Sequence, residues 1–147
     1  MEEVRCLTVN APRRRVWAAC FSHMHWERWD PDISGLADLR GGLEDGSTFS
    51  FVMKKGPVRR IPCVLSRVKE PEGFSFGGRA AGGLFQFCGT ILLSEESPHT
   101  TQIKYSFSMS GCLGSLASKL DPTAVIGGVE QGLCVRHRSN SMLRCGC

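Results

Sequence analysis

The sequence has 147 residues, a hydrophobic fraction of 41% and a charged fraction of 22%, values typical of one globular domain and not of a disordered or fibrous chain. The net charge of +4 is spread over short clusters at residues 13–15, 54–55 and 59–60, so the sequence lacks the contiguous basic face that nucleic-acid binding requires. No apolar run reaches the ~18 residues that span a bilayer, and the first residues lack a secretory-signal pattern. We therefore expect a single cytoplasmic domain over residues 1–147, with no integral membrane segment and no nucleic-acid partner.

Residues 4–9 are rich in β-formers and predict a first strand. The period then becomes helical, because Pro12 suits the first turn of a helix and apolar residues recur every three or four positions: Val16, Trp17, Cys20 and Phe21. This helix should end near Ser22. A second short helical turn is expected at residues 26–29, and the Asp30-Pro31 pair ends it.

Residues 33–111 form six strand-length segments separated by glycine, proline and acidic turns. The segments are 33–40, 47–55, 58–68, 74–80, 84–93 and 101–111. Short connections between consecutive strands predict an antiparallel meander, because parallel neighbours would need a crossover. Alternation within these segments predicts one wet face and one dry face. The dry face collects Phe49, Phe51, Met53, Phe74, Phe76, Phe85, Phe87, Ile103, Tyr105, Phe107 and Met109.

After Gly111 the apolar residues again recur at helical spacing and predict one long C-terminal helix. Glycines at 127, 128 and 132 are unfavourable in a helix interior, by up to about 1 kcal/mol each relative to alanine. Close approach of another group to the backbone is the usual reason for such glycines. The polar end of the chain, from about residue 138, is expected to be frayed.

In the order of its elements the chain resembles the helix-grip superfamily that includes START domains, pollen-allergen ligand carriers and the polyketide cyclase/dehydrase group, also called SRPBCC. The resemblance is carried by "VNAPRRRVWAACF", "WERWDPDI", "GGLEDGSTFSF", "GLFQFCGTILL" and "TQIKYSFSMSG". It implies an α+β helix-grip fold, in which a seven-stranded curved antiparallel sheet wraps a long C-terminal helix and two short helices follow strand 1. It also implies an internal cavity between the sheet and that helix.

The dry sheet face is aromatic, and the predicted covering helix carries glycines where bulky side chains would fill space. We therefore expect a hydrophobic ligand to be bound there by Trp26, Trp29, Phe49, Phe51, Phe76, Phe85, Phe87, Tyr105, Phe107, Gly128 and Gly132. Each aromatic residue could instead be ordinary core. For Trp26 and Trp29 we expect one to seal the end of the sheet and the other to border the cavity. Tyr105, the only tyrosine, needs a polar partner or a ligand oxygen.

The eight cysteines are expected to be reduced, and Cys20, Cys63 and Cys88 to be buried as small hydrophobic side chains. The glycine-rich stretch around Arg79 lacks the residues of a phosphate-binding loop and is interpreted as a gate to the cavity. Cys134, His137, Cys145 and Cys147 match no usual zinc spacing. We therefore expect no metal and no cofactor.

Three functions remain open. The first is binding of a small lipid-, sterol- or polyketide-like molecule for transport, storage or sensing, by a monomer or homodimer. The second is a cyclase/dehydrase-type enzyme, in which His23, His25 or Tyr105 would move protons, although no catalytic constellation is assigned. The third is a co-chaperone-like interaction domain, which would have a filled core and an exposed apolar patch.

Overall fold

The computed structural model describes residues 2–28, 30–55 and 58–111. In these ranges the chain forms β1 (Glu2–Val9), α1 (Arg13–Cys20), the short 3₁₀ helix η1 (Trp26–Arg28), β2 (Ile33–Arg40), β3 (Thr48–Met53), β4 (Arg60–Lys69), β5 (Gly73–Ala80), the short 3₁₀ helix η2 (Ala81–Gly83), β6 (Phe85–Ser97) and β7 (Thr100–Ser110). The predicted long C-terminal helix lies outside the described residues, as do Trp29, Gly128 and Gly132.

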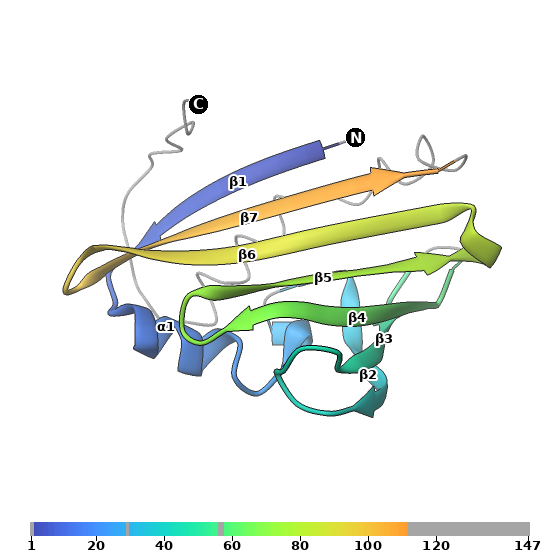
Figure 1. The fold of residues 1–147 in the computed structure, drawn as a ribbon, viewed down its shortest axis with the longest axis horizontal. Helices are drawn as coiled ribbons and strands as arrows, with labels where there is room; N and C mark the ends of the chain where they lie inside the picture. The colour runs from blue at the N-terminus through green and yellow to red at the C-terminus, as the bar shows by residue number, and fades with distance from the viewer. Residues whose placement is uncertain (1, 29, 56–57, 112–147) are drawn as a thin grey trace.

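The seven strands form one antiparallel sheet in the order β1-β7-β6-β5-β4-β3-β2. Strands β2 to β7 follow one another as a meander, and β1 pairs with β7 at one edge. The predicted antiparallel meander is therefore confirmed. Figure 1 shows α1 and the segment that leads to β2 on the same side of the sheet.

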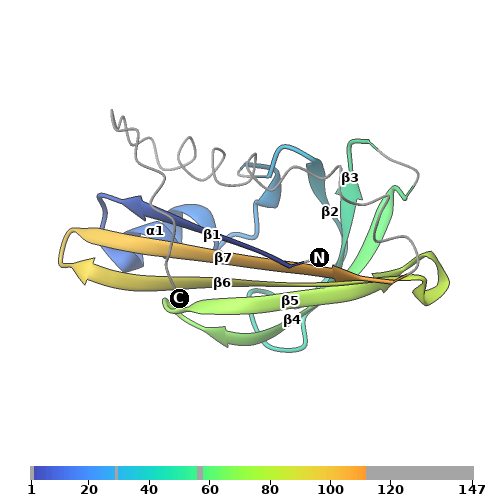
Figure 2. The same ribbon diagram turned by 90° about the horizontal axis from the view of Figure 1, so that it is seen from above.

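The sheet is strongly curved. Figure 2 shows β2 and β3 turned steeply away from the direction of β5, β6 and β7, toward the side that carries α1. Two register shifts, in β2 between Ala37 and Arg40 and in β4 between Ser66 and Lys69, contain the positive-φ residues Asp38 and Arg67. Bulges of this kind bend a strand and increase its twist, which accounts for part of the curvature.

Helix α1 covers one end of the concave face. Val16, Trp17 and Cys20, which helical spacing predicted to form its apolar side, are all buried. A buried hydrogen bond fixes the connection from β1 to this helix: the hydroxyl of Thr101 on β7 donates to the carbonyl of Ala11 at 2.7 Å. The concave face therefore has a closed end at α1.

Candidate ligand-binding face

The concave face of the sheet is formed by the inward side chains of all seven strands. Alternation in β3, β5, β6 and β7 places the predicted aromatic residues on this face, as the sequence indicated. Its buried hydrophobic members from the sheet are Val9, Ile33, Phe49, Phe51, Met53, Cys63, Leu65, Phe74, Phe76, Ala80, Phe85, Phe87, Ile91, Leu93, Ile103, Tyr105 and Met109, and Phe107 is partly buried against them. The set is almost wholly apolar.

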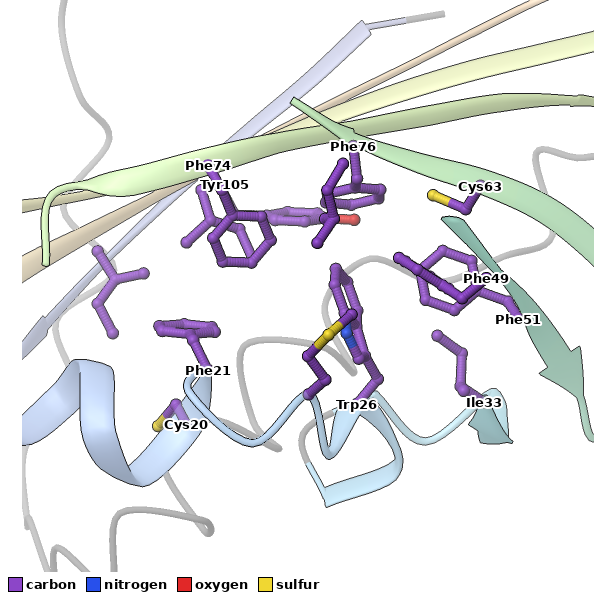
Figure 3. Packing of buried hydrophobic residues seen from close by; sticks show 14 of the residues in the cluster. Cys20, Phe21, Trp26, Ile33, Phe49, Phe51, Cys63, Phe74, Phe76 and Tyr105 are labelled. Carbon is purple, nitrogen blue, oxygen red and sulfur yellow. The ribbon is translucent and has the colours of Figure 1, made fainter. Parts of the chain in front are cut away.

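Trp26 lies at the centre of one aromatic cluster. It projects from η1 between the short helices and the sheet, toward Phe49, Phe51 and Phe76 (Figure 3). Its indole is 2% exposed and meets neighbouring rings edge to face, with centroids 4.8 Å from Phe51 and 4.9 Å from Phe76. Interplanar angles of 69° and 81° are the edge-to-face arrangement, one of the two that aromatic pairs favour. The sealing role, which the sequence assigned to one of the two tryptophans, fits Trp26.

A second group of rings has a different geometry. Tyr105 and Phe107 on β7 are almost parallel, at 11° with centroids 6.2 Å apart, and Phe107 and Phe87 are inclined by 28° at 6.2 Å. Phe85 and Phe87 on β6 are inclined by 25° at 5.9 Å. We call Phe85, Phe87, Tyr105 and Phe107 the aromatic row. Its four rings stand side by side on β6 and β7, and their planes have similar orientations.

The partners of the two groups also differ. In the described part of the chain, the ring contacts of the aromatic row are made within the row and with Phe51 and Phe76, all of which are sheet residues. The Trp26 cluster instead joins the sheet to η1, and Phe21 and Trp17 of the α1 region meet Phe74 at 5.7 and 5.9 Å. Helical residues therefore fill the space over the Phe74 end of the face.

One charged residue on this face was missed by the sequence analysis. Arg5 of β1 pairs in register with Tyr105, and Leu7 and Val9 on the same parity pair with Ile103 and Thr101. Arg5 is half-buried, and its Nε atom is shielded from solvent. Alternation along residues 4–9 could have placed Arg5 on the inward face, because it lies on the same side of the strand as the apolar Val9. The sequence analysis did not assign this arginine to a face.

The histidines proposed for proton transfer are not on the concave face. His23 and His25 are both exposed, with ring centroids 6.2 Å apart, and Nδ1 of His25 lies 3.2 Å from Oε1 of Glu27. Arg79 is exposed as well. Tyr105 is therefore the only one of the three proposed proton-transfer residues that points inward.

Asp30 is a titratable group that the sequence analysis did not single out. It is half-buried in the turn between η1 and β2, and its Oδ1 accepts a hydrogen bond from the N–H of Asp32 at 3.0 Å. Burial raises the pKa of Asp30 to about 6, since loss of water disfavours the carboxylate, and the negative charge of Asp32 adds to the rise. Backbone hydrogen bonds and Lys54 oppose it.

The cysteine predictions are confirmed in part. Cys20 and Cys63 are buried, and burial raises the pKa of Cys20 to about 11 and that of Cys63 to about 12. The prediction is wrong for Cys88, which is exposed with Sγ 2.9 Å from the Ser108 hydroxyl, because position 88 alternates with the inward Phe87. The separate prediction that all eight cysteines are reduced is wrong for Cys6, which is disulfide-bonded.

Among residues 2–28, 30–55 and 58–111, no group of three or more His, Cys, Asp or Glu side chains is arranged to hold a metal ion. The cysteines and histidine weighed as zinc ligands lie outside these ranges. Within the same described residues, no helix has the length and apolar character needed to cross a membrane.

Comparison with solved structures shows what fold the chain has. Norcoclaurine synthase from Thalictrum flavum, solved with dopamine and hydroxybenzaldehyde, superposes with a TM-score of 0.68 at 15% identity, covering 90% of this chain and 83% of that one. The crystal structure of Ara h 8.0201 superposes with a TM-score of 0.66 at 11% identity, covering 90% of this chain and 97% of that one. The di-domain ARO/CYC protein BexL from the BE-7585A biosynthetic pathway gives 0.67 at 13% identity, covering 90% of this chain and 46% of BexL.

These three proteins belong to the SRPBCC helix-grip superfamily, so the resemblance inferred from the sequence is confirmed at the level of the fold. No protein-family model and no curated protein sequence matches the chain. At identities of 11 to 15%, the shared fold does not carry over the activity of any one relative.

Proposed function

We propose that this protein binds a small hydrophobic molecule against the aromatic row on the concave face of its sheet. The observation that carries the proposal is the contrast between two aromatic groups on one surface. The rings around Trp26 pack edge to face and join the sheet to η1, as in a finished core. The rings of the row lie nearly parallel, side by side, and their ring contacts among the described residues are with rings of the sheet.

The physical basis is burial of apolar area. Ligand pockets are mostly apolar, with a few polar groups that orient the bound molecule. Each Å² of ligand surface removed from water contributes roughly 25 cal/mol, so contact with three or four rings supports binding without any charged interaction. Phe107 is the half-buried member of the row, which makes it a natural contact surface.

The fold of the relatives supports this choice over an interaction domain. The norcoclaurine synthase structure contains two small aromatic molecules, and BexL is described as a di-domain ARO/CYC protein of a biosynthetic pathway. Binding of a small molecule is compatible with transport, storage, sensing or a later chemical step. Tyr105 is the inward polar group that an enzymatic version would use.

Native mass spectrometry of protein purified from its own cells tests the proposal. We expect a bound apolar molecule to be retained in the native spectrum and lost on denaturation. Titration with pyrenebutanol, a neutral fluorescent probe, should give saturable binding. The proposal fails if the native mass equals that of the bare chain and the probe shows no saturable binding.

A pair of variants locates the site. Phe107→Ala removes a half-buried ring from the concave face and should weaken pyrenebutanol binding by about fivefold or more, because probe contact area is lost. Leu92→Ala removes an exposed apolar side chain from the convex face of the neighbouring strand and should leave binding unchanged. Equal effects of the two substitutions would exclude the concave face as the site.

A further inference from the structure

The concave face carries a permanent positive charge at a defined position. β1 pairs with β7 so that Arg5 lies directly opposite Tyr105. Side chains directly opposite each other in an antiparallel pair project to the same face, with Cβ atoms roughly 5 Å apart. Tyr105 belongs to the buried aromatic row, so Arg5 enters the same side of the sheet. The shielded Nε atom of Arg5 agrees with this placement.

A guanidinium in this position has a distinct chemistry. Arginine stays charged at any physiological pH, and its planar fork of five N–H donors matches the two oxygens of a carboxylate. Five donors can serve a protein partner and a ligand at the same time, so the argument does not require Arg5 to lack contacts within the protein. Shielding from water strengthens its attraction for an anion.

Tyr105, which lies opposite Arg5 in the sheet, adds a second polar group at this position. Tyr105 is nearly parallel to Phe107 at 6.2 Å and inclined by 26° to Phe76 at 6.5 Å, so its ring is continuous with the aromatic row, while its hydroxyl offers one donor. Arg5 and Tyr105 thus form a polar end on an otherwise apolar surface. Such an arrangement suits a molecule that is apolar along its length and anionic at one end.

We propose that the ligand carries a carboxylate, which Arg5 binds through its guanidinium with help from the Tyr105 hydroxyl, while a flat apolar body lies along the aromatic row. This inference rests on the proposed function and adds the chemical class of the ligand. It does not depend on the exposed histidines or on the basic clusters at residues 54–55 and 59–60, which lie outside the concave face.

The test compares two probes that differ only in the group at one end, pyrenebutyrate and pyrenebutanol, by fluorescence titration near neutral pH. We expect the wild-type protein to bind the carboxylate about tenfold more tightly than the alcohol. Arg5→Met should remove this preference by weakening carboxylate binding about tenfold or more, with alcohol binding unchanged. Arg5→Lys should retain part of the preference, and Tyr105→Phe should weaken carboxylate binding severalfold.

Lys104→Met is the matched control. Lys104 is the neighbour of Tyr105 on β7, is exposed, and pairs in register with Cys6 on the convex face. The substitution removes the same charge from the same part of the sheet but on the other side. It should leave both affinities as they are in the wild type, which separates a local contact from the effect of net charge.

The outcomes distinguish the two proposals. If neither probe binds the wild-type protein, the proposed function itself fails. If both probes bind equally and Arg5→Met changes neither affinity, the hydrophobic site stands and the carboxylate assignment is overturned. If Lys104→Met reduces carboxylate binding as much as Arg5→Met, the preference is a general charge effect and the assignment is likewise overturned. Retained pyrenebutanol binding by Arg5→Met shows that the variant is folded.

Discussion

Trp26 and Tyr105 are both buried aromatic residues on one surface, and their surroundings assign them different roles. Trp26 contacts four phenylalanine rings, at centroid distances between 4.8 and 5.9 Å, most of them nearly perpendicular. Tyr105 has a nearly parallel neighbour at 6.2 Å and an arginine opposite it in the sheet. The first residue is held as core, whereas the second combines a polar atom with an apolar wall.

At the same scale, Asp30 makes the stability of the fold depend on pH. The pKa of Asp30 is raised to about 6 in the folded protein, from 3.8 as the ordinary value. A carboxyl group with a raised pKa binds more protons when folded than when unfolded. Its contribution to stability is therefore complete below about pH 4 and is lost as the pH rises through about 6.

We therefore predict that Asp30→Asn stabilises the protein at about pH 7.5, by as much as ~3 kcal/mol for a shift of this size. The amide removes the buried charge, while its oxygen can still accept the hydrogen bond from the N–H of Asp32. Urea unfolding of the variant and the wild type at about pH 7.5 and about pH 4 measures the effect. The difference should shrink toward zero at the lower pH, and an undiminished difference there would rule out a titrating Asp30 as its source.

At the scale of the elements, close packing between strands depends on a glycine in β6. A Cβ atom added at Gly89 would lie within contact distance of the Phe76 ring on β5, and that ring packs against Trp26 at 4.9 Å. Residue 89 lies at an inward position between Phe87 and Ile91 and pairs in register with Phe76. The absence of a side chain at Gly89 leaves the space that the far end of the Phe76 ring occupies.

Gly89→Ala is predicted to destabilise the fold by about 1–3 kcal/mol, because displacing Phe76 outweighs the lower backbone entropy of alanine. Gly42→Ala is the control: a Cβ there meets nothing within 4 Å and the backbone needs no positive φ, so its effect should stay within about 0.5 kcal/mol. Urea denaturation at a single pH gives both values. A Gly89→Ala variant as stable as Gly42→Ala would show that the Phe76 ring is not confined.

Local patterns in the sequence were sufficient for most elements and for the identity of the inward aromatic residues. Alternation predicted the buried residues of β3 and β7, and helical spacing predicted the buried side of α1. Strand lengths were less predictable. The segment predicted at 84–93 continues as β6 to Ser97, because pairing with β7 holds polar and acidic residues that alone would favour a turn. Arg5 was missed for a different reason: alternation with the buried Val9 places it on the inward face, but an arginine was not expected there.

At the scale of the whole molecule, the curved sheet separates a protected interior from an exposed convex face, and the three free thiols among the described residues report on that separation. Cys20 lies at the end of α1, Cys63 faces inward from β4, and Cys88 faces outward from β6. Burial raises the pKa of Cys20 and Cys63 to about 11 and about 12, so their reactive thiolate forms are scarce as well as inaccessible.

Iodoacetamide labelling followed by peptide mass mapping, without reductant, should therefore modify Cys88 before Cys20 and Cys63. We predict that Cys20 and Cys63 react at least about a hundredfold more slowly, because their labelling requires the domain to open. All three should react readily in concentrated urea, which serves as the control for intrinsic reactivity. If Cys63 reacted as quickly as Cys88 in the native protein, the concave face would be open to solvent at β4, and a ligand bound there would not be held in a closed apolar site. Slow labelling of Cys63 that becomes slower still in the presence of pyrenebutanol would show that ligand binding and closure of this face are linked.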